Sequence, residues 1–196
     1  MTNFILLSLF SYSLGSICFA HLIAKIKKVD LSKTGSKSAT STNLARSVGW
    51  KWGILTAILD LSKGVVPTLL AFHYLENTWQ IIIVSVLPIL GHIYPIFFNF
   101  VGGKGGATFM GIILALVGLK IFLVSLLAWI LVFAITRVSS LTNIIIPWLL
   151  SLFLFFYFPF SSFIIGVIGA SLVSFALRNN IKRLITGKEP KSPANL

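Results

Sequence analysis

A glycine-rich stretch around a single lysine is the segment of this sequence best suited to binding an anion. Residues 91–111 read GHIYPIFFNFVGGKGGATFMG, and Lys104 lies there among the glycines Gly102, Gly103 and Gly105. Glycines let backbone N–H groups approach an anion closely, and the lysine ammonium adds a point charge. Because the stretch joins two apolar runs, we expect it to bind a phosphate at a membrane surface. A flexible turn between two helices is the alternative explanation of the glycines.

A second polar segment, residues 29–49, is dense in serine, threonine, asparagine and glycine. Its candidate ligand-binding residues are Gly35, Ser36, Ser41, Thr42, Asn43 and Arg46. Hydroxyl and amide groups can hydrogen-bond the hydroxyls of a sugar-like ligand, and a guanidinium binds phosphate in a bidentate manner. The segment therefore predicts one wall of a polar pocket. The alternative is a basic loop that is held to anionic lipid headgroups by charge alone.

The other ionisable side chains favour structural roles. Asp60 and Lys63 lie three residues apart within an apolar run, so they can pair on one helix face that points into a helix bundle. We expect His92 to be a hydrogen-bonded packing residue, and His21 and His73 have no metal-ligand spacing. Only four residues are acidic, and no nucleophile lies in a triad-like pattern. The sequence thus predicts neither a metal site nor a cofactor, and it disfavours acid–base catalysis by carboxylates.

Composition predicts an all-α integral membrane protein. Of the 196 residues, 57% are hydrophobic and 10% are charged, which is more apolar surface than a soluble domain can bury. The apolar runs are 4–24, 52–75, 79–100, 105–136, 141–158 and 160–177. As one helix the run 105–136 would be about 48 Å long, against a hydrocarbon core of about 30 Å. We therefore expect a break at Gly118 that gives helices 105–117 and 119–136, and seven transmembrane helices in total.

The distribution of basic residues predicts the orientation. Lysine and arginine concentrate in the loop 25–51 and in the segment that starts at Arg178. With seven spans, every basic residue except Lys63 and Lys120 lies in a cytoplasmic segment, as the positive-inside rule requires. The N-terminus is then outside and the C-terminus is cytoplasmic.

The chain is expected to form a single membrane domain. Residues 1–187 make up this domain, and residues 188–196 are predicted to be a short disordered cytoplasmic tail. The run 4–24 has no basic segment before it and no cleavage site after it, which indicates a retained span rather than a signal peptide. The single cysteine, Cys18, excludes an intrachain disulfide.

Four blocks of residues resemble a known family. Gly15 begins GS-x-x-F-x-x-x-x-AK, Leu59 begins LD-x-x-KG-x-x-P, residues 91–111 form the glycine-rich block, and Asn180 begins a last block that ends at Gly187. In this order they resemble the bacterial acyl-phosphate-dependent glycerol-3-phosphate acyltransferases, the PlsY family. The resemblance covers nearly the whole chain.

The resemblance implies a membrane-bound acyltransferase of phospholipid biosynthesis. Such an enzyme spans the bacterial inner membrane seven times, and its active site faces the cytoplasm. It moves a fatty acyl group from acyl phosphate to the 1-hydroxyl of glycerol 3-phosphate, giving lysophosphatidic acid and phosphate. It needs no metal or cofactor and binds no nucleic acid. Its partners are membrane lipids and, through the donor substrate, an enzyme that produces acyl phosphate.

The resemblance also implies the roles of individual residues. Lys104 would neutralise phosphate oxygens as charge develops in the transition state, and Arg46 would orient the phosphate of the acceptor. Ser36 would contribute a hydrogen bond, so the catalytic residues would be Lys104, Arg46 and Ser36. The substrate-binding residues would be Gly35, Thr42, Asn43, Gly102, Gly103, Gly105, Asn143 and Asn180.

The sequence departs from the family pattern at several positions. Lys37 and Thr40 replace glycines, which would strain the loop if those positions require a positive φ, and Ser38 replaces an asparagine. Asn143 stands where a second serine is usual, and Leu177 stands where a histidine is common. A leucine neither donates nor accepts hydrogen bonds, so we expect it to weaken the acceptor site.

These departures leave other functions open. The chain can be an active enzyme, a paralogue with a different acceptor, or a weakened or inactive paralogue that binds lipid or partners. A small membrane transporter is a further alternative, because the apolar composition by itself is compatible with one. Transporters often carry intramembrane charges and repeated halves; here only Asp60 and Lys63 fit, and no repeat is visible.

Overall fold

The structure, a computed structural model, describes residues 1–36 and 38–191. Over these residues the protein is an all-helical membrane protein. The helices are α1 (Thr2–Gly15), α2 (Phe19–Ile26), α3 (Ser41–Val48), α4 (Trp50–Tyr74), α5 (Thr78–Ile93), the 3-10 helix η1 (Ile96–Phe98), α6 (Gly106–Thr136), α7 (Ser139–Tyr157), α8 (Phe160–Ala176) and α9 (Arg178–Ile185). Five segments are long and apolar enough to cross a membrane, or six if α8 and α9, bent by 66°, count as one. The predicted all-α membrane fold is confirmed.

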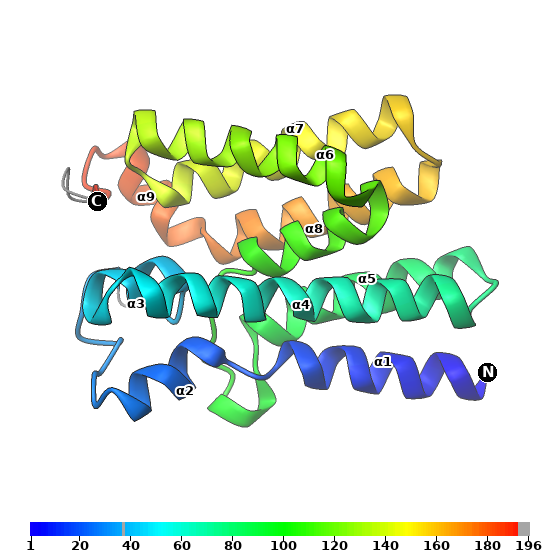
Figure 1. Ribbon diagram of the computed structural model, residues 1–196, viewed down its shortest axis with the longest axis horizontal. Helices are drawn as coiled ribbons and strands as arrows, with labels where there is room; N and C mark the ends of the chain where they lie inside the picture. Colours follow the sequence, from blue (N-terminus) through cyan, green and yellow to red (C-terminus); the bar gives the residue numbers. More distant parts are fainter. Residues whose placement is uncertain (37, 192–196) are drawn as a thin grey trace.

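The long helices lie side by side along one axis (Figure 1). One half of the bundle contains α1, α4 and α5, and the other contains α7, α8 and the second part of α6. Contacts of α4 with α6 and of α5 with α8 join the two halves. The N-terminus lies at one end of the long axis, whereas α3 and α9 lie at the opposite end. The polar segment between α2 and α4 therefore shares an end of the molecule with the C-terminal helix.

The predicted break at Gly118 is confirmed. Gly118 has φ 76° and ψ 172°, which is not helical, and the chain folds back at this point within α6 (Figure 1). Nothing lies within 4 Å of the position that a Cβ would take, so the glycine is required by its backbone conformation and not by lack of space. The first part of α6 thus runs into the bundle and the second part returns toward the end at which it began.

The first predicted span, 4–24, is interrupted between α1 and α2. Residues 16–18 separate α1 from α2 and release backbone carbonyls from helical bonding. The buried Lys63 ammonium donates to two of these carbonyls, Ile17 O at 2.9 Å and Gly15 O at 3.3 Å. Lys63 also pairs with Asp60 at 2.7 Å, which confirms the predicted ion pair. Because lipid offers no hydrogen-bond donors to a broken helix, its freed carbonyls need partners inside the protein, and the Lys63 ammonium is one.

Two glycines let α4 and the first part of α6 pack backbone against backbone. A Cβ on Gly64 would collide with the carbonyl oxygen of Thr108, and a Cβ on Gly111 would collide with that of Leu61. Small residues at such contacts allow close approach of membrane helices. This contact fixes the start of α6, and with it the glycine-rich loop that precedes the helix.

Candidate active site

A cavity of about 420 Å³ lies where the polar segments meet, a size typical of ligand sites. Its polar lining includes Ser36, Ser38, Thr40, Ser41, Thr42, Arg46, Lys104, Ser139, Ser140, Asn143, Asn180 and Glu189. Its apolar lining includes Ile54, Ala57, Ile58, Leu61, Met110, Phe122, Leu126, Trp129 and Leu177. The cavity thus joins a polar, partly cationic part to an apolar part formed by α4 and α6. Such a cavity suits a molecule that has an anionic head and an apolar chain.

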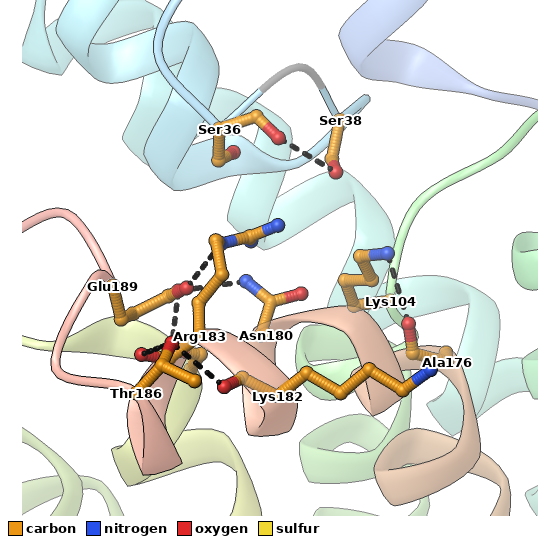
Figure 2. Close-up of polar contacts among 10 residues, drawn as sticks. Ser36, Ser38, Lys104, Ala176, Asn180, Lys182, Arg183, Thr186 and Glu189 are labelled. Atoms are coloured by element: carbon orange, nitrogen blue, oxygen red, sulfur yellow. Dashed lines mark hydrogen bonds and ion pairs between the residues drawn. The ribbon is translucent and has the colours of Figure 1, made fainter.

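The glycine-rich loop directs Lys104 into the polar part of the cavity. The Gly103 N–H donates to the carbonyl of His92 at 3.0 Å, which holds the loop against the end of α5. Gly105 then takes a left-handed conformation, with φ 78°, and directly precedes α6. The Lys104 ammonium donates to the carbonyl of Ala176, the last residue of α8, at 2.9 Å (Figure 2). Only one of its three donors is used there, so the others can reach a ligand.

The electrostatic surroundings of Lys104 favour binding of an anion. Burial lowers the pKa of Lys104, and the nearby Arg178 and Arg183 lower it further, whereas the Glu189 carboxylate opposes them. An incoming phosphate would stabilise the ammonium and would be attracted by the same cluster of cations. Such a cluster of cations is chemically suited to an anionic ligand.

The polar segment before α4 is shaped by Asn43, which is fully buried and does not line the cavity. Its Oδ1 accepts from the N–H of Ser36 at 3.0 Å, and its Nδ2 donates to the carbonyls of Thr34 at 3.1 Å and Ser38 at 3.0 Å. Gly35 has φ 52°, and a Cβ there would collide with the Asn43 amide. Asn43 and Gly35 therefore form the support that presents Ser36 to the cavity.

The predicted strain at Thr40 is absent. Thr40 has φ −118°, an ordinary extended conformation, so this position does not require glycine. Its Oγ1 accepts from the N–H of Asn43 at 3.2 Å and caps the first turn of α3. A threonine stabilises this helix start, which a glycine side chain could not do. The other replaced glycine, Lys37, lies outside the residues that the structure describes.

Helix α3 places Arg46 and Thr42 along one side, one turn apart, and both line the cavity. Leu44 lies on the opposite side of α3 and is fully buried. Burial lowers the pKa of the Arg46 guanidinium, and the Glu189 carboxylate opposes this effect. A second half-buried cation therefore faces the space that Lys104 reaches from another element.

Glu189 is a site residue that the sequence analysis missed. Its Oε1 accepts from Ser140 Oγ and from Asn180 Nδ2, each at 2.7 Å, and its Oε2 accepts from Arg183 Nε at 2.7 Å. Figure 2 shows the carboxylate reaching Asn180 and Arg183 from the segment after α9. The side chain is 7% exposed although it belongs to the predicted tail 188–196, of which the structure describes residues 188–191.

Gly187 is the residue from which the sequence could have predicted that the segment carrying Glu189 folds back onto the protein. It has φ 68°, and its N–H donates to the carbonyl of Leu184 at 3.1 Å while that of Lys188 donates to the carbonyl of Arg183 at 2.8 Å. This pair of bonds is a Schellman motif, which ends a helix and turns the chain back along it. A glycine two residues before the only acidic residue of the segment was therefore a clue that the carboxylate returns to the body.

Asn143 and Leu177 both line the cavity. Asn143 accepts from Trp129 Nε1 at 3.2 Å and donates to the carbonyl of Ser139 at 2.8 Å. Its amide lies against Gly106, where a Cβ would collide with it. Leu177 lies at the junction of α8 and α9 and is 3% exposed. The cavity therefore has an apolar wall beside the polar Asn180.

The structure brings most of the predicted site residues together at one cavity. Those that line it are Ser36, Thr42, Arg46, Lys104, Gly105, Asn143 and Asn180. Those that lie behind the lining are Gly35, Asn43, Gly102 and Gly103. Over residues 1–36 and 38–191, no three side chains of the histidine, cysteine or acidic types are grouped as metal ligands.

Comparison with known proteins gives concordant matches over nearly the whole chain. A family model described as glycerol-3-phosphate acyltransferase matches residues 5–187. The glycerol-3-phosphate acyltransferase of Aquifex aeolicus (strain VF5) is 38% identical over 187 residues, which cover 93% of this chain and 96% of the relative. That of Prochlorococcus marinus (strain MIT 9301) is 40% identical over 192 residues, covering 95% and 96%.

Two solved structures match as well. Both are crystal structures of PlsY (YgiH), an integral membrane glycerol 3-phosphate acyltransferase. The glycerol 3-phosphate form has a TM-score of 0.91 and 38% identity, and the match covers 97% of this chain and 96% of that one. The lysophosphatidic acid form has a TM-score of 0.89 and 37% identity with the same coverage.

Proposed function

Because the chain belongs to the glycerol-3-phosphate acyltransferase family, as its motifs predicted, we propose that it acylates glycerol 3-phosphate with acyl phosphate as the donor. The acyl group goes to the 1-hydroxyl, and the products are lysophosphatidic acid and inorganic phosphate. The observation that carries this proposal is the cavity itself. In it two cations from separate elements, Lys104 and Arg46, face a polar space that continues into an apolar one.

The polar part of the cavity suits the phosphoryl groups of both substrates. Arg46 can bind the phosphate of the acceptor in a bidentate manner, and the Lys104 ammonium can neutralise the phosphate that leaves the donor. Ser36 and Asn180 supply neutral hydrogen bonds nearby. With two phosphates in one site, two separate cations reduce the repulsion between them.

The apolar part suits the acyl chain. It is lined on α4 by Ile54 and Ile58, whose side chains are also exposed on the lipid-facing surface, and on α6 by Phe122 and Leu126. A chain bound there would remain in contact with the bilayer, so the product can leave sideways into lipid without crossing water. The apolar part of the cavity therefore lies between α4 and the part of α6 that follows Gly118.

The reaction needs no covalent intermediate on the protein. The 1-hydroxyl oxygen attacks the acyl carbonyl carbon, the bond between that carbon and the phosphate oxygen breaks, and the hydroxyl proton is accepted by a phosphate oxygen. Phosphate dianions are basic enough to accept it, and phosphate is a good leaving group when its charge is neutralised. Lys104 stabilises that developing charge, a contribution that typically lowers a barrier by about 2.7–4 kcal/mol.

We further propose that the chain crosses the bacterial inner membrane seven times, with the N-terminus outside and the cavity facing the cytoplasm. The fold-back at Gly118 adds a crossing, and an odd number of crossings agrees with the position of α3 and α9 at the end opposite the N-terminus. This end carries the basic residues of the loop 25–51 and of α9. An enzyme that produces acyl phosphate at the same membrane would supply the donor.

The proposed function is tested by acyl transfer on purified protein with acyl phosphate and radiolabelled glycerol 3-phosphate. We expect labelled lysophosphatidic acid. Lys104→Ala should lower the rate about a hundred- to a thousandfold, and Lys104→Arg should rescue it poorly because a planar guanidinium does not replace a compact ammonium. Lys120→Ala is the matched control, since Lys120 is exposed at the turn of α6. The proposal fails if the parent forms no labelled product, or if Lys104→Ala keeps the parental rate.

A further inference from the structure

We infer that His92 is a substrate-binding residue whose Nε2–H donates a hydrogen bond to an anionic phosphoryl oxygen in the cavity, and that Lys63 fixes the ring in this tautomer. The inference rests on the proposed function, because it supposes that phosphoryl groups bind beside Lys104. Neither residue was expected to act on substrate: the sequence predicted a packing histidine and a structural ion pair. Their contacts to each other and to the glycine-rich loop indicate a more direct role.

The histidine ring lies directly beneath the glycine-rich loop. His92 is in the last turn of α5, is 4% exposed, and lines the same cavity as Lys104 and Gly105. Its carbonyl accepts from the Gly103 N–H at 3.0 Å. A Cβ on Gly103 would collide with His92 Nε2, so this nitrogen is the ring atom turned toward the loop. Gly103 therefore leaves room for the ring and does not itself line the cavity.

The other ring nitrogen faces a buried ammonium. Lys63 Nζ lies 3.0 Å from His92 Nδ1 and 2.7 Å from Asp60 Oδ1. An ammonium has three donors and no acceptor, so Nδ1 must accept a hydrogen bond and cannot carry a proton. Asp60 Oδ1 is 3.6 Å from Nδ1, which is too long for a hydrogen bond. The remaining proton of the neutral ring is therefore on Nε2.

The Nε2–H lacks an internal partner. Within the described part of the chain, no hydrogen bond reaches Nε2, although the side chain is only 5% exposed. A donor that is held in a fixed tautomer and turned toward an anion-binding loop is completed by a ligand oxygen. A phosphoryl oxygen of either substrate has the required chemistry. The neutral Nε2–H would orient the phosphoryl group, whereas Lys104 and Arg46 would supply the positive charge that attracts it.

Two substitutions at His92 separate substrate binding from packing. In His92→Asn, the amide oxygen lies near the place of Nδ1, so Lys63 keeps an acceptor but the donor toward the cavity is lost. In His92→Gln, the amide nitrogen lies near the place of Nε2, so the donor is kept. We expect His92→Asn to lower kcat/KM about ten- to a hundredfold, the value of a hydrogen bond to a charged group, and His92→Gln to retain most activity.

The substrate whose KM rises in His92→Asn identifies the phosphoryl group. Acyl phosphate and glycerol 3-phosphate are varied separately, and a rise for one of them assigns the contact to that substrate. A packing role alone predicts the opposite order, with His92→Asn as active as the parent and His92→Gln impaired, and this result would overturn the inference.

A measurement on the unaltered protein does not depend on how the variants fold. The protein is labelled with ¹⁵N-histidine, and signals are assigned with His21→Gln and His73→Gln. The His92 Nε2 signal should be protonated and should shift when inorganic phosphate is added. A proton on Nδ1, or no shift at saturating phosphate, would contradict the inference. An inactive parent whose Nε2 signal still responds would contradict the proposed function and still support this one.

Discussion

Replacing Glu189 by glutamine is expected to weaken both the fold and the acceptor site. The carboxylate now accepts from Ser140, Asn180 and Arg183, each at 2.7 Å. In Glu189→Gln one oxygen can still accept from two donors. The new NH₂ group, however, must face a donor of one of the three partners. The substitution thus removes one hydrogen bond and the charge that strengthens the others.

The magnitude follows from the exposure of the partners. A hydrogen bond to a charged group contributes about 1.5–3 kcal/mol and a neutral one about 1 kcal/mol. The Arg183 side chain is 37% exposed, so water screens its ion pair and its contribution is at the low end. The buried bonds to Ser140 and Asn180 lose their charge assistance. We therefore expect a loss of about 1–3 kcal/mol in the free energy of unfolding.

The effect on activity should be larger for binding than for turnover. Ser140 and Asn180 line the cavity, and the carboxylate fixes their orientation, so the KM for glycerol 3-phosphate should rise several-fold. Thermal unfolding in detergent and steady-state kinetics on the same preparation measure the two effects. Glu76→Gln is the matched control, since Glu76 is exposed at the far end of α4. The reasoning is refuted if Glu189→Gln matches the parent in both measurements.

Three further changes test other parts of the structure. Leu177→His should add a hydrogen bond worth about 0.5–1.5 kcal/mol to the acceptor site, and this should lower the KM for glycerol 3-phosphate about three- to tenfold. Unchanged kinetics in an active protein would mean that residue 177 only packs against its neighbours. Gly118→Ala should lower the free energy of unfolding by about 1–3 kcal/mol, because φ 76° with ψ 172° is a conformation that essentially only glycine adopts, although the site has space for a Cβ. Thermal unfolding measures this, and equal stability would contradict the backbone argument. Cysteines at Ser32 and Lys191 in a Cys18→Ser background should both be protected from an impermeant reagent in intact cells, and labelling of either from outside would disprove the seven-span orientation.

Local features of the sequence were enough to predict much of the fold. Apolar runs of membrane-spanning length predict helices directly, because a lipid core requires continuous internal hydrogen bonding. The run 105–136 was too long for one crossing, and Gly118 was its most permissive residue, so the break could be predicted. Asp60 and Lys63 could be paired because residues three apart face the same side of a helix. The motif blocks predicted the family, although not the geometry of the site.

The sequence also predicted several of the segments that supply the cavity, but not which of their residues would reach it. Asn43 was expected to contact substrate, yet its amide is used within its own loop. Gly103 was expected to bind phosphate through its backbone, yet its N–H is used by His92. In both cases the spacing along the chain gave the correct segment. The direction of each group depended on how that segment packs against another.

Only the tertiary structure decided the long-range contacts of the site. Lys63 donates to carbonyls of a broken helix more than forty residues earlier, and to a histidine on the next helix. Glu189 reaches α7 across 49 positions of sequence. Such pairs leave no periodic signal, since they depend on which helices become neighbours after folding and on where a helix ends. Span length and helix breaks are therefore set by local physics, whereas the partners of the buried charges are set by the packing of the bundle.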